Sequence, residues 1–164
     1  MNAILTSNAR LYASRHQLEL AEPLGSGKDG IVLAGKRKIE PANVAIKALR
    51  FAEGYLREKL TYQRLKDAEV SSLLGFRVPQ LIGVDDELRV IEMTIVARPF
   101  VLDFAGAYLD ERPEFPEDVW SHWEAEKREQ FEARWPVVKK VLGAFEELGV
   151  YLLDVSPGNI AFLD

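Results

Sequence analysis

The chain has 164 residues, 48% of them hydrophobic and 29% charged, no cysteine, and a formal net charge of −5. This length suits one compact domain that needs no disulfide, and the lack of thiols excludes thiolate metal sites. The acidic balance argues against a general nucleic-acid binder, and without a signal-type start or a long apolar run we expect a cytoplasmic protein that does not bind membranes.

Residues 1–16 carry few structural signals, and we expect only a lead-in segment there. The two histidines, His16 and His122, lie far apart in the sequence and have no ligand-type neighbours. We therefore expect neither histidine to be catalytic.

Residues 17–49 read as three antiparallel strands, and the first two are joined by a glycine-rich turn. Gly25, Gly27 and Gly30 follow the pattern G-x-G-x-x-G-x-V. A strand follows the third glycine, whereas a dinucleotide-binding fold needs a helix there. Glycines at a hairpin tip let backbone N–H groups approach phosphate oxygens, because no Cβ stands in the way.

The third strand contains Val44-Ala45-Ile46-Lys47. A lysine at this distance from the glycines would supply a positive charge for the phosphates of a nucleotide. The plainer alternative is a flexible hairpin followed by a solvated strand lysine. The combination of the glycine pattern with V-A-I-K favours the phosphate site.

A helix is expected next, over residues 51–68, with apolar residues at helical spacing and charges between them. Those apolar residues are Tyr55, Leu56, Leu60 and Leu65. Residues 78–85 and 89–96 then look like a hairpin that turns at 85–87 and completes a five-stranded sheet.

The second half of the chain reads as mainly helical. Residues 99–116 form a loop-rich connection in which 101–109 could make a short helix, and residues 117–134 read as a longer one. Another helix starts at Pro136 and ends before Gly149, where a positive φ is expected. We expect the aromatic residues Trp120, Trp123, Phe131 and Trp135 to pack in a core and the charges at 124–128 to form a solvated face.

The final stretch contains Asp154 and Asn159 in the spacing D-x-x-x-x-N. Pro157 and Gly158 lie between them and would bend the loop, so that both side chains point into one cleft.

The glycine pattern, the V-A-I-K strand, the following helix and D-x-x-x-x-N occur in the order found in the protein kinase-like superfamily, which the chain resembles over about residues 17–164. The resemblance implies an α+β, bilobal fold in a single domain, residues 1–164. Its first lobe would hold the five-stranded antiparallel sheet and one helix over about 17–97. A hinge at about 94–99 would lead into a reduced, mainly helical lobe over about 100–164.

The resemblance also implies ATP and Mg²⁺ as cofactors and gives each motif a role. Lys47 would neutralise the phosphates, and a helix glutamate would hold it: Glu53 and Glu58 are both candidates, and we favour Glu58 because it lies deeper in the helix. Asp154 would act as the base and Asn159 would hold the metal. The hinge near residues 94–98 would receive the adenine, with Met93 or Glu92 at the back of the pocket. The nucleotide-binding set is Gly25, Gly27, Gly30, Val32, Ala45, Lys47 and Ile95.

The catalytic stretch departs from ordinary protein kinases. Leu152-Leu153 replaces the usual His-Arg before the aspartate, and Ser156 stands where a lysine is usual, as in RIO-type atypical kinases. Pro157-Gly158-Asn159 is similar to the P-G-N of aminoglycoside and other small-molecule kinases. The given sequence ends five residues after Asn159 without a DFG-type aspartate, and Asp164 lies too close to Asn159 to replace one. We expect either a truncated or degenerate kinase core or a sequence that lacks its tail. Metal binding should then be weak unless Asp154 or Asp164 substitutes.

Three functions follow from these observations. The first is a slow ATP-dependent phosphotransferase, of the Ser/Thr protein kinase type or acting on a small molecule. The second is a pseudokinase that binds nucleotide or a partner without turnover. The third is an α+β domain whose motifs coincide by chance. A shortened second lobe would also leave apolar surface that a second copy could cover as a homodimer.

Overall fold

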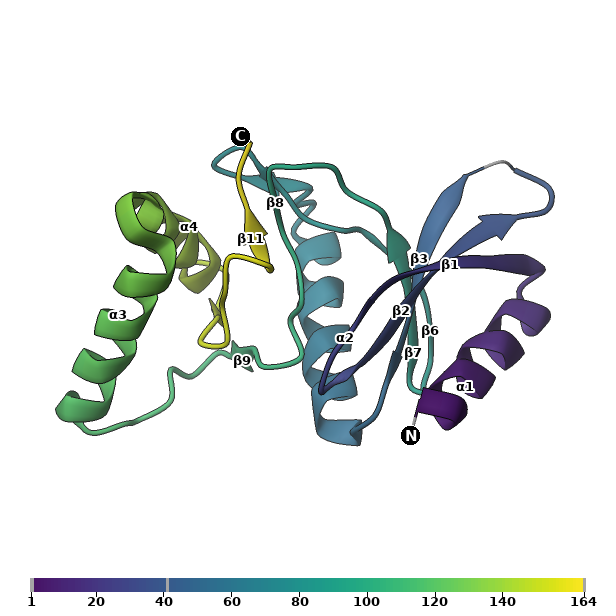
Figure 1. Cartoon of the computed structure of the whole chain (residues 1–164), viewed down its shortest axis with the longest axis horizontal. Helices are drawn as coiled ribbons and strands as arrows, with labels where there is room; N and C mark the ends of the chain where they lie inside the picture. Colours follow the sequence, from purple (N-terminus) through teal and green to yellow (C-terminus); the bar gives the residue numbers. More distant parts are fainter. Residues whose placement is uncertain (1, 41, 164) are drawn as a thin grey trace.

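The computed structural model describes residues 2–40 and 42–163 and has an α+β architecture (Figure 1). Its largest element is a five-stranded antiparallel sheet in the order β1-β2-β3-β7-β6, which confirms the predicted strands and hairpin. The strands are β1 (Leu18–Ser26), β2 (Gly30–Arg37), β3 (Asn43–Leu49), β6 (Leu81–Asp85) and β7 (Val90–Thr94).

Strand β3 is at the centre of the sheet and is buried on both faces. Side chains alternate along a strand, so Val44 and Ile46 join a hydrophobic cluster on one face while Ala45 and Leu49 join a larger cluster on the other. Lys47 shares the face of Ala45 and Leu49, between Val32 of β2 and Ile91 of β7 in the register of the sheet. This alternation directs its ammonium group away from α1 and toward α2.

Residues 1–16 are more than the expected lead-in segment, because helix α1 (Asn2–Arg15) covers one face of the sheet (Figure 1). Its buried residues are Leu5, Ala9, Tyr12 and Ala13. They recur at i, i+4, i+7 and i+8, which is the spacing of one helical face. Small alanines among them make the apolar stripe weak in the sequence, although the helix packs closely on the sheet.

Helix α2 (Ala52–Asp67) lies on the other face, as predicted, but only Tyr55 and Leu65 of the four predicted apolar residues are on its buried side. Leu56 and Leu60 are 51% and 40% exposed. The buried face instead consists of Tyr55, Glu58, Thr61, Tyr62 and Leu65. The helix is rotated relative to the predicted apolar stripe, and this rotation turns a glutamate toward the sheet.

The segment after β7 contains short strands, and the helix predicted over 101–109 is wrong. Strands β8 (Phe100–Val101), β5 (Phe76–Arg77), β4 (Ser72–Leu73) and β11 (Ile160–Ala161) form a second sheet in the order β11-β8-β5-β4. Strands β9 (Tyr108–Leu109) and β10 (Val150–Tyr151) form a separate pair. A helix cannot run through this segment because Asp103 has a φ of +73° and its flanking residues pair as strands.

The helical part follows as predicted. Helix α3 (Glu117–Phe131) continues through a 3₁₀ turn (Glu132–Arg134) into α4 (Trp135–Glu146), and Gly149 has a φ of +75° just beyond the end of α4. The charges at 124–128 do not all form a solvated face, because Lys127 is only 6% exposed. Its ammonium reaches a buried backbone carbonyl, which is why it does not point into solvent.

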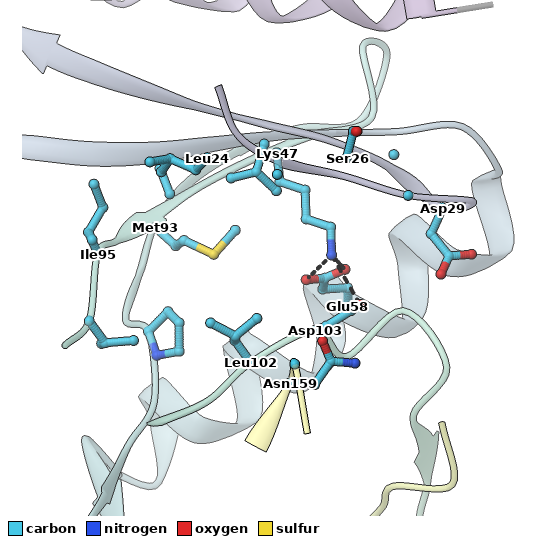
Figure 2. Close-up of a pocket in the computed structure, with 18 of the residues that line it drawn as sticks. Leu24, Ser26, Asp29, Lys47, Glu58, Met93, Ile95, Leu102, Asp103 and Asn159 are labelled. Carbon is cyan, nitrogen blue, oxygen red and sulfur yellow. Dashed lines mark hydrogen bonds and ion pairs between the residues drawn. The ribbon is translucent and has the colours of Figure 1, made fainter. Parts of the chain in front are cut away.

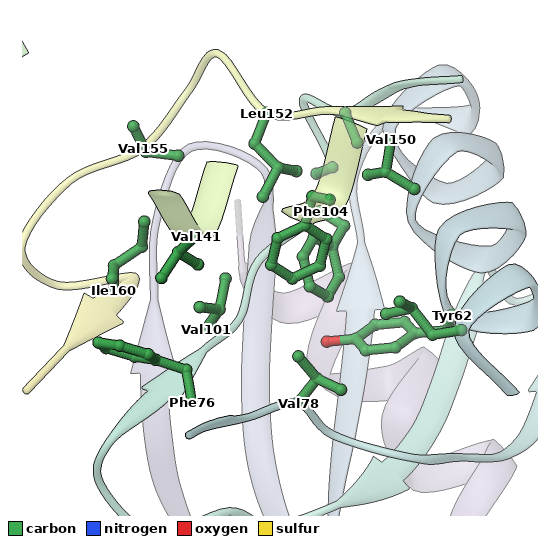
Figure 3. Close-up of a cluster of buried hydrophobic side chains, with 14 of the residues drawn as sticks. Tyr62, Phe76, Val78, Val101, Phe104, Val141, Val150, Leu152, Val155 and Ile160 are labelled. Atoms are coloured by element: carbon green, nitrogen blue, oxygen red, sulfur yellow. The ribbon is translucent and has the colours of Figure 1, made fainter. Parts of the chain in front are cut away.

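One hydrophobic cluster joins the sheet, α2, the short strands and α4 (Figure 3). Phe104 lies near its centre, 5.1 Å from Tyr62 of α2 and 5.7 Å from Phe145 of α4, measured between ring centroids. Arg64 of α2 adds a polar link through two bonds to Asp110, of 2.7 and 3.0 Å. The two halves of the chain are therefore packed together. Among the described residues no helix is both long and apolar enough to cross a membrane.

A buried polar contact attaches α1 to the sheet and yields a prediction about stability. The Tyr12 hydroxyl donates to Glu92 at 2.7 Å, and Arg37 forms an ion pair with the same buried carboxylate. Replacing Arg37 with methionine removes the charged partner, and we expect the unfolding free energy to fall by about 1–3 kcal/mol in urea denaturation. Arg10→Met on the exposed side of α1 is the control and should change it by less than about 0.5 kcal/mol. Equal losses in the two variants would contradict this account of Glu92.

Candidate functional site

A cavity of about 600 Å³ opens between the glycine hairpin, the sheet and the segments around Asp103 and Asn159. This volume is in the range of small-molecule sites. Figure 2 shows apolar side chains at one end and charged side chains at the other. All the sequence-predicted site residues line it: Gly25, Gly27, Gly30, Val32, Ala45, Lys47, Glu58, Ile95, Asp154 and Asn159.

Lys47 and Glu58 form an ion pair at the back of the cavity, as predicted. The Lys47 Nζ lies 2.8 Å from Glu58 Oε2 and 2.9 Å from Oε1. Both side chains are buried, at 8% and 1% exposure. The other candidate, Glu53, is excluded from this role because it is exposed and pairs with Arg57 at 2.7 Å.

The charges of this pair are set by burial and by each other. Burial disfavours the Lys47 ammonium, but the carboxylates of Glu58 and Asp103 outweigh it and raise the pKa of Lys47. Lys47 therefore stays positively charged. Burial raises the pKa of Glu58, and the Lys47 charge opposes that rise only in part.

The sequence analysis missed Asp103, which is the third member of this cluster. Its Oδ1 lies 3.1 Å from Lys47 Nζ, and a third of its side chain is exposed to the cavity. The second carboxylate was expected after Asn159, whereas Asp103 comes before it in the chain. The signal that could have found it is Asp103-Phe104-Ala105-Gly106, an aspartate and an aromatic residue followed by small residues.

The backbone on both sides holds Asp103 at this place. Strand β8 ends two residues before it, and the Leu102 N–H donates to the Asn159 carbonyl at 3.0 Å. Phe104 on the other side is fully buried. Asp103 has a positive φ, a conformation that costs other residues more than aspartate, so the anchors on both sides maintain it.

The pairing of β8 with β11 brings Asp103 and Asn159 together. Val101 pairs with Ile160 and Phe100 with Ala161 in antiparallel register. The two strands run in opposite directions, so the residues just after β8 and just before β11 lie at the same end. Figure 2 shows the Asn159 amide beside Asp103.

Asp154 lies on a loop whose shape follows from its sequence. The Asn159 N–H donates to the Ser156 carbonyl at 2.9 Å, which closes a turn with Pro157 at its second position, where proline is favoured. Leu152 and Val155 are buried, while the Asp154 side chain between them is 60% exposed. Its carboxylate lies 3.3 Å from the ammonium of Lys28 in the glycine hairpin.

The apolar end of the cavity is lined by Leu24, Val32, Ala45, Met93 and Ile95. Met93 is at the predicted place, but Glu92 is not, since it faces Tyr12 on the α1 side of the sheet. After β7 ends at Thr94, Ile95 and Val96 leave the sheet and line the cavity. Within the described chain their backbone groups make no hydrogen bond to other backbone groups, so they are free to bind a ligand.

The three glycines of the hairpin are present for different reasons. A Cβ on Gly30 would lie 2.2 Å from the Ala48 carbonyl oxygen of β3, so close strand pairing requires glycine there. A Cβ on Gly25 or Gly27 would meet nothing within 4 Å. These two positions leave open space above the cavity. The Gly27 N–H donates to the Gly30 carbonyl and closes the hairpin, so it is not a free donor in this conformation.

Asp103 and Asn159 could together hold a divalent cation. Mg²⁺ is commonly bound by one or two carboxylates together with phosphate oxygens, and these two side chains offer oxygen donors of that kind. Within residues 2–40 and 42–163 no group of three or more His, Cys, Asp or Glu side chains is placed so that it could hold a metal ion by itself. Asp164, the other carboxylate considered from the sequence, lies outside the described residues.

Comparison with protein-family models and with curated proteins found no match to this chain. Its function therefore has to be argued from the residues and their geometry.

The three glycines of the hairpin give a prediction about stability. Gly30→Ala should lower the unfolding free energy by about 1–3 kcal/mol, because its Cβ would displace the Ala48 carbonyl. Gly25→Ala and Gly27→Ala should change it by less than about 0.5 kcal/mol, since neither glycine has a positive φ and the space around them is open. Urea denaturation of the three variants provides the measurement. A stable Gly30→Ala protein would show that the β2–β3 pairing is looser than described.

Proposed function

We propose that this chain is a kinase-like protein that binds ATP with Mg²⁺ and transfers the γ-phosphoryl group to a hydroxyl acceptor. The observation that carries the proposal is the Lys47 ammonium, held by Glu58 at the back of a cavity that also contains Asp103, Asp154 and Asn159. Phosphoryl transfer depends mainly on positioning and on charge neutralisation, and these groups can supply both.

The two ends of the cavity suit the two parts of a nucleotide. Val32, Ala45 and Met93 offer apolar surface for a base, and the free backbone groups of Ile95 and Val96 offer hydrogen bonds to its edge. At the other end, Lys47 and the open glycine hairpin suit phosphates.

The charge around the cavity supports a requirement for a divalent cation. Its lining has two ammonium groups, Lys28 and Lys47, against the four carboxylic side chains of Asp29, Glu58, Asp103 and Asp154. A triphosphate entering alone would meet net repulsion, even with Glu58 protonated. Mg²⁺ held by Asp103, Asn159 and the phosphate oxygens would reverse that balance and neutralise the charge that develops during transfer.

The arrangement fits a kinase-like bilobal fold with an altered chain order. In protein kinases the metal-binding aspartate follows the catalytic asparagine. Here the proposed equivalent, Asp103, lies 56 positions before Asn159 in the sequence and reaches it through the β8–β11 pair. Asp103 would therefore supply the metal-binding carboxylate that the stretch after Asn159 lacks.

Three of the charged side chains take part in the transfer step. The Asp154 carboxylate accepts the proton of the acceptor hydroxyl, and that oxygen attacks the γ-phosphorus. The bond between the γ-phosphorus and the bridging oxygen breaks, and ADP leaves with the electron pair. Lys47 stabilises the phosphate charge, and Glu58 keeps Lys47 in place.

A second candidate is a pseudokinase that binds nucleotide without turnover. The observation that favours it is the ion pair between Lys28 and Asp154, because it holds the proposed base against the glycine hairpin. Both side chains are well exposed, so water and salt weaken this pair. A bound triphosphate would attract Lys28 and free Asp154, which is why we favour the enzyme.

The first experiment is a thermal-shift titration with ATP, with and without Mg²⁺. At 100 times the dissociation constant a ligand stabilises the folded state by about 2.7 kcal/mol. We expect wild type to shift with MgATP and much less with ATP alone. Asp103→Ala should lose the metal-dependent part, because the metal loses its carboxylate. The double variant Lys47→Met/Glu58→Gln should lose the shift without leaving an unpaired buried charge.

Lys139→Met, an exposed change on α4, is the control and should bind like wild type. Release of ADP from MgATP then separates the two candidates: the enzyme loses turnover in Asp154→Asn, whereas a pseudokinase shows none in either protein. A folded wild type that does not shift with millimolar MgATP would contradict nucleotide binding altogether.

A further inference from the structure

Two side chains of α3 contact the loop that carries Asp154. The Trp123 Nε1–H donates to the Leu153 carbonyl at 2.9 Å, and the Lys127 ammonium donates to the Val155 carbonyl at 2.7 Å. The two carbonyls belong to the residues directly before and after Asp154. Trp123 and Lys127 are four positions apart, so they lie on one face of the helix.

The burial of Lys127 is unusual for a lysine. It is 6% exposed, and its ammonium is bonded to the Val155 carbonyl and, at 3.3 Å, to the Gln130 side chain. Among the described residues one carboxylate forms an ion pair with it, Glu126 at 3.8 Å, and that carboxylate is half exposed. Lysine is seldom buried without a close counter-charge, because the ammonium loses its hydration. The contact with the loop is thus its main polar interaction.

Asp154 itself has few contacts that could fix its side chain. Among the described residues its carboxylate forms an ion pair with Lys28, whose side chain is 77% exposed. The Asp154 Cβ packs against Gly106, and a Cβ added at Gly106 would be only 3.0 Å from it. The place of the carboxylate is therefore set by the backbone of residues 153–155, which Trp123 and Lys127 hold from the other side.

We infer that Trp123 and Lys127 are positioning residues that fix the backbone on both sides of Asp154 and so direct its carboxylate toward the phosphate end of the cavity. This inference rests on the proposed function, in which Asp154 accepts the proton of the acceptor. A displacement of about 1 Å at a reacting group can cost about 100-fold in rate, so two hydrogen bonds at this place matter to turnover.

The alternative is that both residues only stabilise the fold. Trp123 packs edge to face with Trp120 and Trp135, at centroid distances of 6.0 and 5.9 Å, and its partly buried ring packs against the hydrophobic core in either case. Trp123→Phe keeps an aromatic ring but removes the N–H donor. Lys127→Met keeps the length of the side chain but removes the ammonium, and Lys127→Arg restores a charged donor.

The test measures ADP release from MgATP, with water as the acceptor, and MgATP affinity in the same proteins. Trp120→Phe and Lys139→Met are matched controls, because the described side-chain hydrogen bonds and ion pairs to residues 153–155 come from Trp123, Lys127 and Lys28 and not from these two residues. We expect kcat to fall about 10- to 100-fold in Trp123→Phe and Lys127→Met, with KM for ATP and MgATP affinity within twofold of wild type. Lys127→Arg should recover part of kcat, and the controls should match wild type.

Other outcomes overturn the inference. If kcat and affinity fall together, or if the variants lose turnover only as they unfold on heating, the two residues are structural. If wild type neither binds nor hydrolyses MgATP, the proposed function itself fails. Amide hydrogen exchange then tests the inference without any ligand. Faster exchange confined to residues 153–159 in both variants would still show that α3 holds this loop, and unchanged exchange there would refute it.

Discussion

The position of Lys47 is the constraint on which the rest of this structure depends. Its ammonium is buried between Glu58 of α2 and Asp103 after β8, so one side chain of the central strand links three separate segments. Burying such charges gains little net stability, because desolvation offsets their attraction. Their geometry is nevertheless demanding: α2 must turn Glu58 toward the sheet, and the backbone must hold Asp103 at positive φ.

The sequence predicted the parts of the site that local patterns encode. Glycines in a hairpin, an alternating strand with Lys47 and a helix with Glu58 are each recognisable within a few residues. Helix α1 was missed, although its spacing is helical, because two of its four buried residues are alanines and give a weak hydrophobic signal. Lys127 was misread because a run of charges usually indicates a solvated face, and only tertiary structure shows which member points inward.

Asp103 could not be assigned from the sequence for a different reason. Its role depends on a pairing between β8 and β11, whose partners lie about 60 positions apart, and each strand has only two residues. Strands this short carry no periodicity that a sequence pattern can reveal. The local sequence instead suggested a helix over 101–109. Tertiary packing around Phe104 overrides that preference. The same packing places the Asp103 carboxylate, next to Phe104 in the chain, at the cavity.

The cavity is therefore a product of the whole fold. At its apolar end, Ala45 and Met93 belong to the large hydrophobic cluster and Val32 packs against it. The same cluster contains Phe104, which follows Asp103, and Leu152 and Val155, which lie on either side of Asp154 in the sequence. A change in that cluster would shift the backbone that holds Asp103 and Asp154 relative to Lys47, since Phe104 and Val155 next to the two aspartates belong to it. Buried positions of the cluster therefore help to place the side chains that line the cavity. The glycine hairpin shows the same dependence. Gly30 allows β2 to pair closely with β3, and this pairing places Gly25 and Gly27 over the cavity.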